Sequence, residues 1–181
     1  MEPRIVAFPP LACPDASVLV LGTMPSVASL DARQYYAHPR NAFWPIMGEL
    51  LEFDATAPYR ERCHALTAGG VALWDVLASC EREGSLDSAI RAEVPNDIGT
   101  FLAAHPKIRA ILFNGQPASR LWRKHCRILD VTRFESHTLP STSPAHAGKN
   151  YAEKLQEWRS CVMRFVGIEV KGVNAEPVER Q

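Results

Sequence analysis

The chain has 181 residues, a length that suits one compact domain. Hydrophobic residues make up 46% of it and charged residues 22%, a globular composition that excludes disordered, collagenous and membrane-embedded proteins. Because 20 Lys and Arg residues balance 20 Asp and Glu residues, bulk positive charge is excluded as a means of holding nucleic acid, and any such site must be a local patch.

Four apolar runs that end in polar or turn residues predict β-strands. They span residues 17–21, 70–74 and 108–113, with a weaker, alternating run over 132–139. Segments with a one-sided apolar stripe predict helices over residues 43–53, 59–68, 117–126 and 151–166. This alternation predicts a single α/β domain over residues 1–181, a three-layer fold with a central, mainly parallel four-stranded sheet flanked by helices. Its core is expected over residues 16–166, between polar terminal segments.

Functional side chains in such a fold lie on the loops at the carboxyl ends of the strands. The first strand runs into Gly-Thr-Met-Pro-Ser at residues 22–26, and the fourth into Leu-Pro-Ser-Thr-Ser-Pro-Ala-His at residues 139–146. Asp75 and Asn114 follow the second and third strands. The site is therefore expected on these four loops.

The cysteines and histidines predict neither disulfides nor a metal site. The five cysteines are scattered without a CxxC pair, and the six histidines form no zinc motif such as HExxH. The N-terminal segment lacks the uninterrupted apolar run of a signal peptide or a spanning helix. We therefore expect a cytoplasmic monomer with no metal, no cofactor and no membrane partner.

Taken together, three segments resemble motifs of the uracil-DNA glycosylase superfamily. Gly22–Pro25 matches its Gly-x-x-Pro loop, and His38–Trp44 matches the His-Pro-x-Asn-x-Phe-Trp segment of the mismatch-specific branch. The loop at residues 139–146 matches the Ser-Pro-containing loop after the last strand, and the resemblance extends over about residues 18–165. It implies a monofunctional enzyme of base excision repair that flips a deaminated base out of DNA and hydrolyses its N-glycosidic bond.

Two positions depart from the usual pattern of that superfamily. Met24 stands where most branches have an Asp or Asn that positions the attacking water, and Ser141 stands where a His often stabilises the departing base. This combination most closely resembles the hypoxanthine-DNA glycosylase branch, which implies Asn41 as catalytic and hypoxanthine or uracil as the base. Some relatives hold an iron–sulfur cluster near the N-terminus, but only Cys13 lies there in this chain, so no cluster is predicted.

Asn41 and Phe43 each have a structural alternative. The amide oxygen of Asn41 can hold a water, but Asn is also a favoured helix N-cap, and a helix is expected to begin at Phe43. Phe43 can stack on a flipped base, as the family pattern implies, or pack in the core. We favour the functional interpretation for both residues and core packing for Trp44.

The loop after the fourth strand carries hydroxyls that suit a phosphate or a base edge. A turn capped by its own Ser and Thr side chains is the ordinary alternative. The two interpretations have equal weight for Ser141, which is kept as a catalytic candidate, whereas the resemblance favours DNA contact for Ser143. His146 is a binding candidate without an assigned role.

The remaining candidates belong to the base pocket. By resemblance Asp75 occupies the position of a base-reading Asn in the uracil-specific branch, with a helix or turn cap as an equal alternative. Asn114 is favoured as a turn residue and kept in reserve as a ligand to the base. The first loop supplies Gly22, Met24, Pro25 and Ser26. A bulky Tyr follows the Pro in the uracil-specific branch, so Ser26 leaves room for a purine.

A basic helix face provides a weak signal for DNA binding. Arg120, Arg123, Lys124 and Arg127 share one face of a predicted helix, where they can meet phosphates or form an ordinary solvated face.

Two other functions compete with the glycosylase interpretation. Met24 and Ser141 make a non-catalytic nucleic-acid-binding member of the same fold credible. A hydrolase that uses Ser141 or Ser143, with His137 or His146 and Asp75, is less favoured because neither Ser lies in a Gly-x-Ser-x-Gly elbow.

Overall fold

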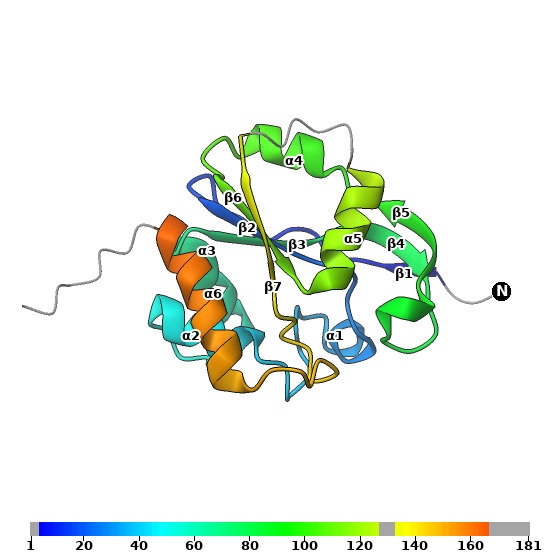
Figure 1. Ribbon diagram of the computed structural model, residues 1–181, viewed down its shortest axis with the longest axis horizontal. Coiled ribbons are helices and arrows are strands. Elements are labelled where there is room, and N and C mark those ends of the chain that lie inside the picture. The colour runs from blue at the N-terminus through cyan, green and yellow to red at the C-terminus, as the bar shows by residue number, and fades with distance from the viewer. Residues whose placement is uncertain (1–3, 127–132, 167–181) are drawn as a thin grey trace, which may run out of the picture.

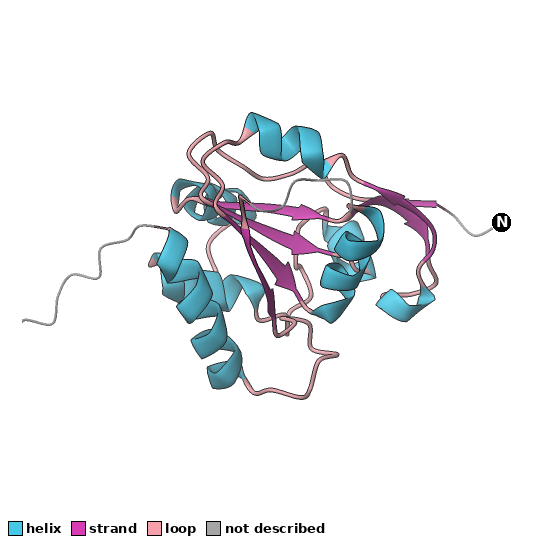
Figure 2. Cartoon of the chain, turned by 45° about the horizontal axis from the view of Figure 1, so that its top comes forward, coloured by secondary structure: helices cyan, strands magenta, loops and turns pink. Residues whose placement is uncertain are grey.

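The centre of the fold is a parallel sheet of four strands in the order β3-β2-β6-β7 (Figure 1). The computed structural model describes residues 4–126 and 133–166. The four strands are β2 (Val18–Gly22), β3 (Val71–Asp75), β6 (Ala110–Asn114) and β7 (Glu135–Leu139). Their arrows fan out in one general direction in Figure 2, so their carboxyl ends share one edge. The predicted α/β fold with a mainly parallel four-stranded sheet is confirmed.

Side-chain alternation along the strands divides the core into two layers. Val18 and Val20 of β2 point into one cluster, and Leu19 and Leu21 point into the other. Because β2 is covered on both faces and lies between two neighbours, all its residues are buried and its sequence is an unbroken apolar run.

Helices cover one face of the sheet, and helices with a second sheet cover the other. The first layer holds α2 (Phe43–Leu51), α3 (Tyr59–Ala68) and α6 (Tyr151–Phe165), which lie to the left of the sheet in Figure 1. Helices α4 (Ile98–Ala104) and α5 (Gln116–His125) pack on the opposite face. Within the described part of the chain, no helix has both the length and the apolar character needed to cross a membrane.

Several short elements were not predicted from the sequence. They are a three-stranded antiparallel sheet in the order β1-β4-β5, helix α1 (Val27–Ala32) and the 3₁₀ turn η1 (Asp87–Ala89). The strands are β1 (Arg4–Val6), β4 (Leu77–Glu81) and β5 (Arg91–Pro95). Strands β1 and β5 are largely exposed, so they lack apolar periodicity, and β4 follows β3 after a single residue.

The core reaches further toward the N-terminus than residue 16, where the sequence pattern places its start. Leu11 and Leu73 exchange two backbone hydrogen bonds, of 2.9 and 2.8 Å. The carbonyl of Phe8 accepts from the Trp74 indole at 3.1 Å. The predicted start of the last strand, residue 132, lies outside the described residues, and β7 begins at Glu135.

Trp158 joins helix α6 to the loop after β7, and its replacement tests that connection. The ring is fully buried, and its Nε1 donates to the buried carbonyl of Pro140 at 3.0 Å. We expect Trp158→Phe to lower the free energy of unfolding by about 1–3 kcal/mol, because it leaves that carbonyl without a donor. Urea denaturation measures the loss.

Trp74→Phe is the control, since it also removes an indole hydrogen bond, but from a half-buried ring. An equal loss in the two variants would contradict the role given to Trp158.

Candidate functional site

A small inner pocket lies at the carboxyl edge of the parallel sheet. Its volume is about 100 Å³, and it is lined by the ends of β2, β3 and β6, the segment before α2 and the loop after β7. A larger outer groove of about 400 Å³ adjoins it and shares Ser85, Asp87, Ser141 and Ser143 with it. The chain leaves β2 toward β3 and later returns to β6 on the other side, so the pocket lies where strand order reverses, the usual place for a ligand.

Gly22 and Asp75 form the floor of the inner pocket, at paired positions of β2 and β3. A Cβ on Gly22 would lie 2.5 Å from Asp75 Oδ1 and 3.0 Å from the Tyr36 hydroxyl, so only glycine fits there. Asp75 is 3% exposed, and its Oδ2 has no hydrogen-bond partner among the described residues. The carboxyl thus faces the pocket instead of capping a helix.

The protonation of Asp75 is determined mainly by the burial of its carboxyl. Burial and, to a smaller extent, the negative charge of Asp87 raise the pKa of this carboxyl, Arg82 opposes them, and the net pKa is about 7. Near neutral pH the carboxyl therefore exists in both forms. Its protonated form can donate one hydrogen bond and accept another, whereas its ionised form only accepts.

Asn41 lines the inner pocket and lies just before helix α2, whose N-cap residue is Ala42 and not Asn41 as the capping alternative has it. Its Oδ1 nevertheless accepts from the backbone N–H of Phe43, the first residue of the helix, at 3.0 Å. A carbonyl oxygen has two lone pairs, which leaves one for a ligand or a water. The hydrogen bond to Phe43 fixes the orientation of the amide at the pocket wall.

Phe43 lies in the core and not on the pocket surface. Its ring is fully buried, with Trp158 edge-on at 6.2 Å and Tyr36 stacked on it at a centroid distance of 4.2 Å. In the DNA-free protein Phe43 therefore packs in the core, and Tyr36 covers the ring on which a base was expected to stack. Trp44 is buried as predicted, and its indole donates to the Tyr35 carbonyl at 2.8 Å.

Asn114 holds the loop after β7 against the end of β6. Its Nδ2 donates to Thr142 Oγ1 and its Oδ1 accepts from Thr142 N–H, both at 2.9 Å. The turn role favoured for Asn114 is thus incomplete, because the side chain is a two-point clamp. Ser141 and Ser143 line both hollows and also accept from backbone N–H groups of their own loop at 3.2 Å, as the turn alternative predicts.

Lys154 supports the same loop and was not identified from the sequence. The residue is 6% exposed, and its ammonium donates to the carbonyls of His146 at 3.0 Å and Ser143 at 3.4 Å. Burial lowers the pKa of this amine. The available signal was its position one turn before Trp158 on the apolar stripe of α6, where a lysine needs acceptors.

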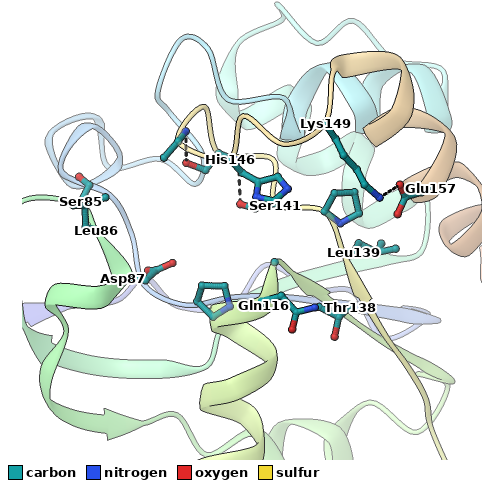
Figure 3. Close-up of a pocket in the computed structure, with 15 residues that line it drawn as sticks. Ser85, Leu86, Asp87, Gln116, Thr138, Leu139, Ser141, His146, Lys149 and Glu157 are labelled. Atoms are coloured by element: carbon teal, nitrogen blue, oxygen red, sulfur yellow. Dashed lines mark hydrogen bonds and ion pairs between the residues drawn. The ribbon is translucent and has the colours of Figure 1, made fainter.

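The outer groove presents polar groups from several separate parts of the chain (Figure 3). Ser85 and Asp87 come from the loop between β4 and β5, and Asp87 accepts from Thr23 Oγ1 at 2.6 Å. His146 and the Lys149–Glu157 ion pair lie across the groove from them. Sequence patterns did not place the β4–β5 loop at the site, because that hairpin was not predicted.

The first-loop residues Gly22, Met24, Pro25 and Ser26, predicted to bind the base, line the inner pocket. Pro25 and Ser26 are part of its wall, and Met24 is 7% exposed because its thioether packs into the second core cluster. Ser26 also caps helix α1, accepting from Ser29 N–H at 3.2 Å.

The basic face of α5 is partly neutralised. Lys124 and His125 both contact Glu93 of β5, at 2.7 and 2.6 Å. Arg127 lies outside the described residues. This face therefore adds little to the case for DNA binding.

Neither the hydrolase alternative nor a metal centre finds support in the arrangement of side chains. Ser141 lies on the loop with His146, but in residues 4–126 and 133–166 no hydrogen bond joins a serine hydroxyl to a histidine ring. His137 instead contacts Glu135 at 3.5 Å. Three or more His, Cys, Asp or Glu side chains that could hold a metal do not gather anywhere in the described ranges.

Comparisons with known proteins agree on one family. A family model for the uracil DNA glycosylase superfamily matches residues 9–165. Proteins named hypoxanthine DNA glycosylase from Methanosarcina barkeri and Methanosarcina acetivorans are 32% and 34% identical over 140 residues, which cover 77% of this chain and 86% of each relative. The solution NMR structure of a candidate uracil DNA glycosylase from M. acetivorans matches with a TM-score of 0.75 at 31% identity, covering 89% of this chain and 98% of that one.

The buried Asp75 carboxyl predicts a specific dependence of stability on pH. Because its pKa is raised in the folded state, the folded protein binds more protons than the unfolded chain between about pH 4 and pH 7, so this group destabilises the fold as pH rises through that window. Asp75→Asn removes the effect. We expect the stability of the variant relative to wild type to increase by up to about 4 kcal/mol between pH 4.5 and pH 8, measured by urea denaturation.

The control for the change in net charge is Asp31→Asn, because Asp31 is an exposed carboxylate on α1. If Asp75→Asn shows the same stability difference from wild type at both pH values, the raised pKa is refuted.

Proposed function

The chain belongs to the uracil-DNA glycosylase superfamily, and within it we propose that the protein hydrolyses the N-glycosidic bond of hypoxanthine in DNA, at least as fast as that of uracil. The observation that carries this proposal is that Asn41 and the unpartnered carboxyl of Asp75 line one pocket. The names of the Methanosarcina relatives add support for the base.

Cleavage of a glycosidic bond develops positive charge on the sugar and negative charge on the departing base. A water then adds to the anomeric carbon and gives up one proton, while the departing base anion takes one up. Asn41 has one lone pair of Oδ1 left to orient this water and to stabilise the charge on the sugar. An amide is a weak proton acceptor, so we assign Asn41 to orientation and electrostatics more than to general-base catalysis.

Polar groups of the pocket match the edge of a deaminated base. Hypoxanthine carries an acceptor at O6 and a donor at N1, whereas adenine carries an amino donor at position 6. The neutral carboxyl of Asp75 can accept from N1–H and donate to O6. The Ser141 hydroxyl can also donate, since its oxygen already accepts from Ser143 N–H, and donors facing O6 select against the adenine amino group.

The outer groove is the proposed path of the DNA strand beside the flipped nucleotide. Ser143 and His146 line this groove, where the hydroxyl and the imidazole suit phosphate oxygens. A single-turnover excision assay on duplexes that each carry one damaged base tests the function directly. Binding without excision would instead favour the non-catalytic alternative.

Replacement of Asn41 tests the assignment of the water-orienting group. We expect Asn41→Ala to reduce single-turnover excision by about 10²-fold or more while DNA binding persists. Because Asn41 also accepts from the first N–H of α2, the matched variant is Asn41→Ser, which keeps an acceptor oxygen but loses the amide. An active Asn41→Ser protein would show that the amide is not required.

Replacement of Ser26 tests the size of the pocket. We expect Ser26→Tyr to slow hypoxanthine excision by about tenfold or more relative to uracil excision, because the added ring narrows the space for a purine. Ser26→Ala is the control, since it also loses the cap of α1 without adding bulk. Single-turnover rates on matched duplexes give the ratio, and undiminished hypoxanthine excision by the Tyr variant would refute the steric argument.

A further inference from the structure

Tyr36 lies in the inner pocket in the manner of a bound base. Its ring stacks on Phe43 with the centroids 4.2 Å apart and the planes 30° from parallel. This offset stack is the contact that a flat heterocycle makes on an aromatic ring. Phe43 is fully buried, so the ring of Tyr36 occupies the space in which Phe43 would meet a ligand.

The hydroxyl of Tyr36 reaches the pocket floor. It lies 3.0 Å from the position of a Cβ on Gly22, the same position that lies 2.5 Å from Asp75 Oδ1. Both the Tyr36 hydroxyl and Asp75 Oδ2 are buried without a hydrogen-bond partner in the described residues. Two unsatisfied polar atoms at one place indicate that a ligand or water completes this floor.

Few interactions hold the Tyr36 side chain in the pocket. Its φ of 53° lies in the left-handed region, which is unfavourable for a side chain of this size. The neighbouring Tyr35 is fixed, because its N–H donates to Tyr59 Oη at 3.0 Å and its hydroxyl donates to the Pro9 carbonyl at 3.1 Å. The backbone is thus anchored beside Tyr36. The Tyr36 ring lies between Phe43 and Tyr35, and no hydrogen bond within the described residues ties down its hydroxyl.

The volume of the inner pocket also requires a displacement. About 100 Å³ is available, whereas pockets that enclose small molecules span roughly 300–1,000 Å³. With the Tyr36 ring in place, the inner pocket by itself is smaller than the sites that enclose a purine and its sugar. Rotation of that ring would add the space that it vacates and would expose one face of Phe43.

We propose that Tyr36 occupies the place of the excised base in the DNA-free protein and that a base must displace it, which makes Tyr36 a specificity-determining residue. This proposal rests on the function proposed above. A base enters only if the free energy it gains by stacking on Phe43 and by hydrogen bonding at the floor exceeds the free energy lost when the Tyr36 ring leaves Phe43. A deaminated base supplies those hydrogen bonds at Asp75, whereas a base with a mismatched edge leaves polar atoms unpaired.

Two variants test the displacement. Tyr36→Ala empties the place, while Tyr36→Phe keeps the stacked ring and loses only the unpartnered hydroxyl. If the ring competes with the ligand, the apparent affinity for free hypoxanthine equals the affinity of the open pocket multiplied by the fraction of pockets that are open. We therefore expect Tyr36→Ala, in which every pocket is open, to bind free hypoxanthine about tenfold more tightly than wild type. Tyr36→Phe should stay within about threefold of wild type.

Selectivity is the second measurement. We expect the ratio of single-turnover excision rates for hypoxanthine over adenine to fall by about tenfold or more in Tyr36→Ala. The opposite result, weaker base binding with slower excision, would show that Tyr36 is a fixed platform on which the base stacks, and it would overturn the proposal. Unchanged binding and selectivity would overturn it too.

Wild-type protein gives a measurement that does not depend on the fold of a variant. The ring resonances of Tyr36, assigned by their loss in Tyr36→Phe, should lose the ring-current shift from Phe43 when hypoxanthine or a non-cleavable deoxyinosine duplex is added. Resonances that do not move on saturation with ligand would contradict the displacement. Absence of wild-type excision would count against the proposed function alone, because base binding still reports on Tyr36.

Discussion

Thr142 connects three parts of the chain that make up the site. Its side chain and N–H contact Asn114 at the end of β6, both at 2.9 Å, and its carbonyl accepts from Ala42 N–H at 3.0 Å. Ala42 directly follows Asn41, so Thr142, which is 1% exposed, fixes the distance between the Asn41 amide and the loop of Ser141 and Ser143. Buried hydrogen bonds of this kind are costly to break, which keeps the two loops in register.

Around this clamp, the pocket combines an apolar enclosure with a few charges that are kept from water. Arg82 is 5% exposed and donates to the carbonyls of Pro25 and Gly84, so it supports the first loop from behind. Its charge opposes the effects of burial on the carboxyls of Asp75 and Asp87, both of which have raised pKa values. A floor of this kind suits a ligand that carries its own donors and acceptors and brings little net charge.

Apolar patterning predicted the parallel sheet, because β2 and β6 are buried on both faces and their sequences are therefore almost unbroken apolar runs. It missed β1 and β5, whose side chains are mostly exposed, and with them the loop that brings Asp87 to the site. Motifs singled out Asn41 and Asp75, and the fold brings both to the inner pocket. They did not indicate that Tyr36 covers Phe43, because a left-handed backbone and a ring stack between neighbouring loops leave no periodic trace in the sequence.

Gly22 restricts how this site can change during evolution. No side chain fits between the Asp75 carboxyl and the Tyr36 hydroxyl, so the strand at the centre of the sheet cannot acquire a new contact to the ligand. Variation in the preferred base must then arise at the pocket walls, such as Ser26 or Tyr36, where loops tolerate substitution better than a buried strand. Related proteins with different substrates are therefore expected to share the floor of this pocket and to differ along its rim.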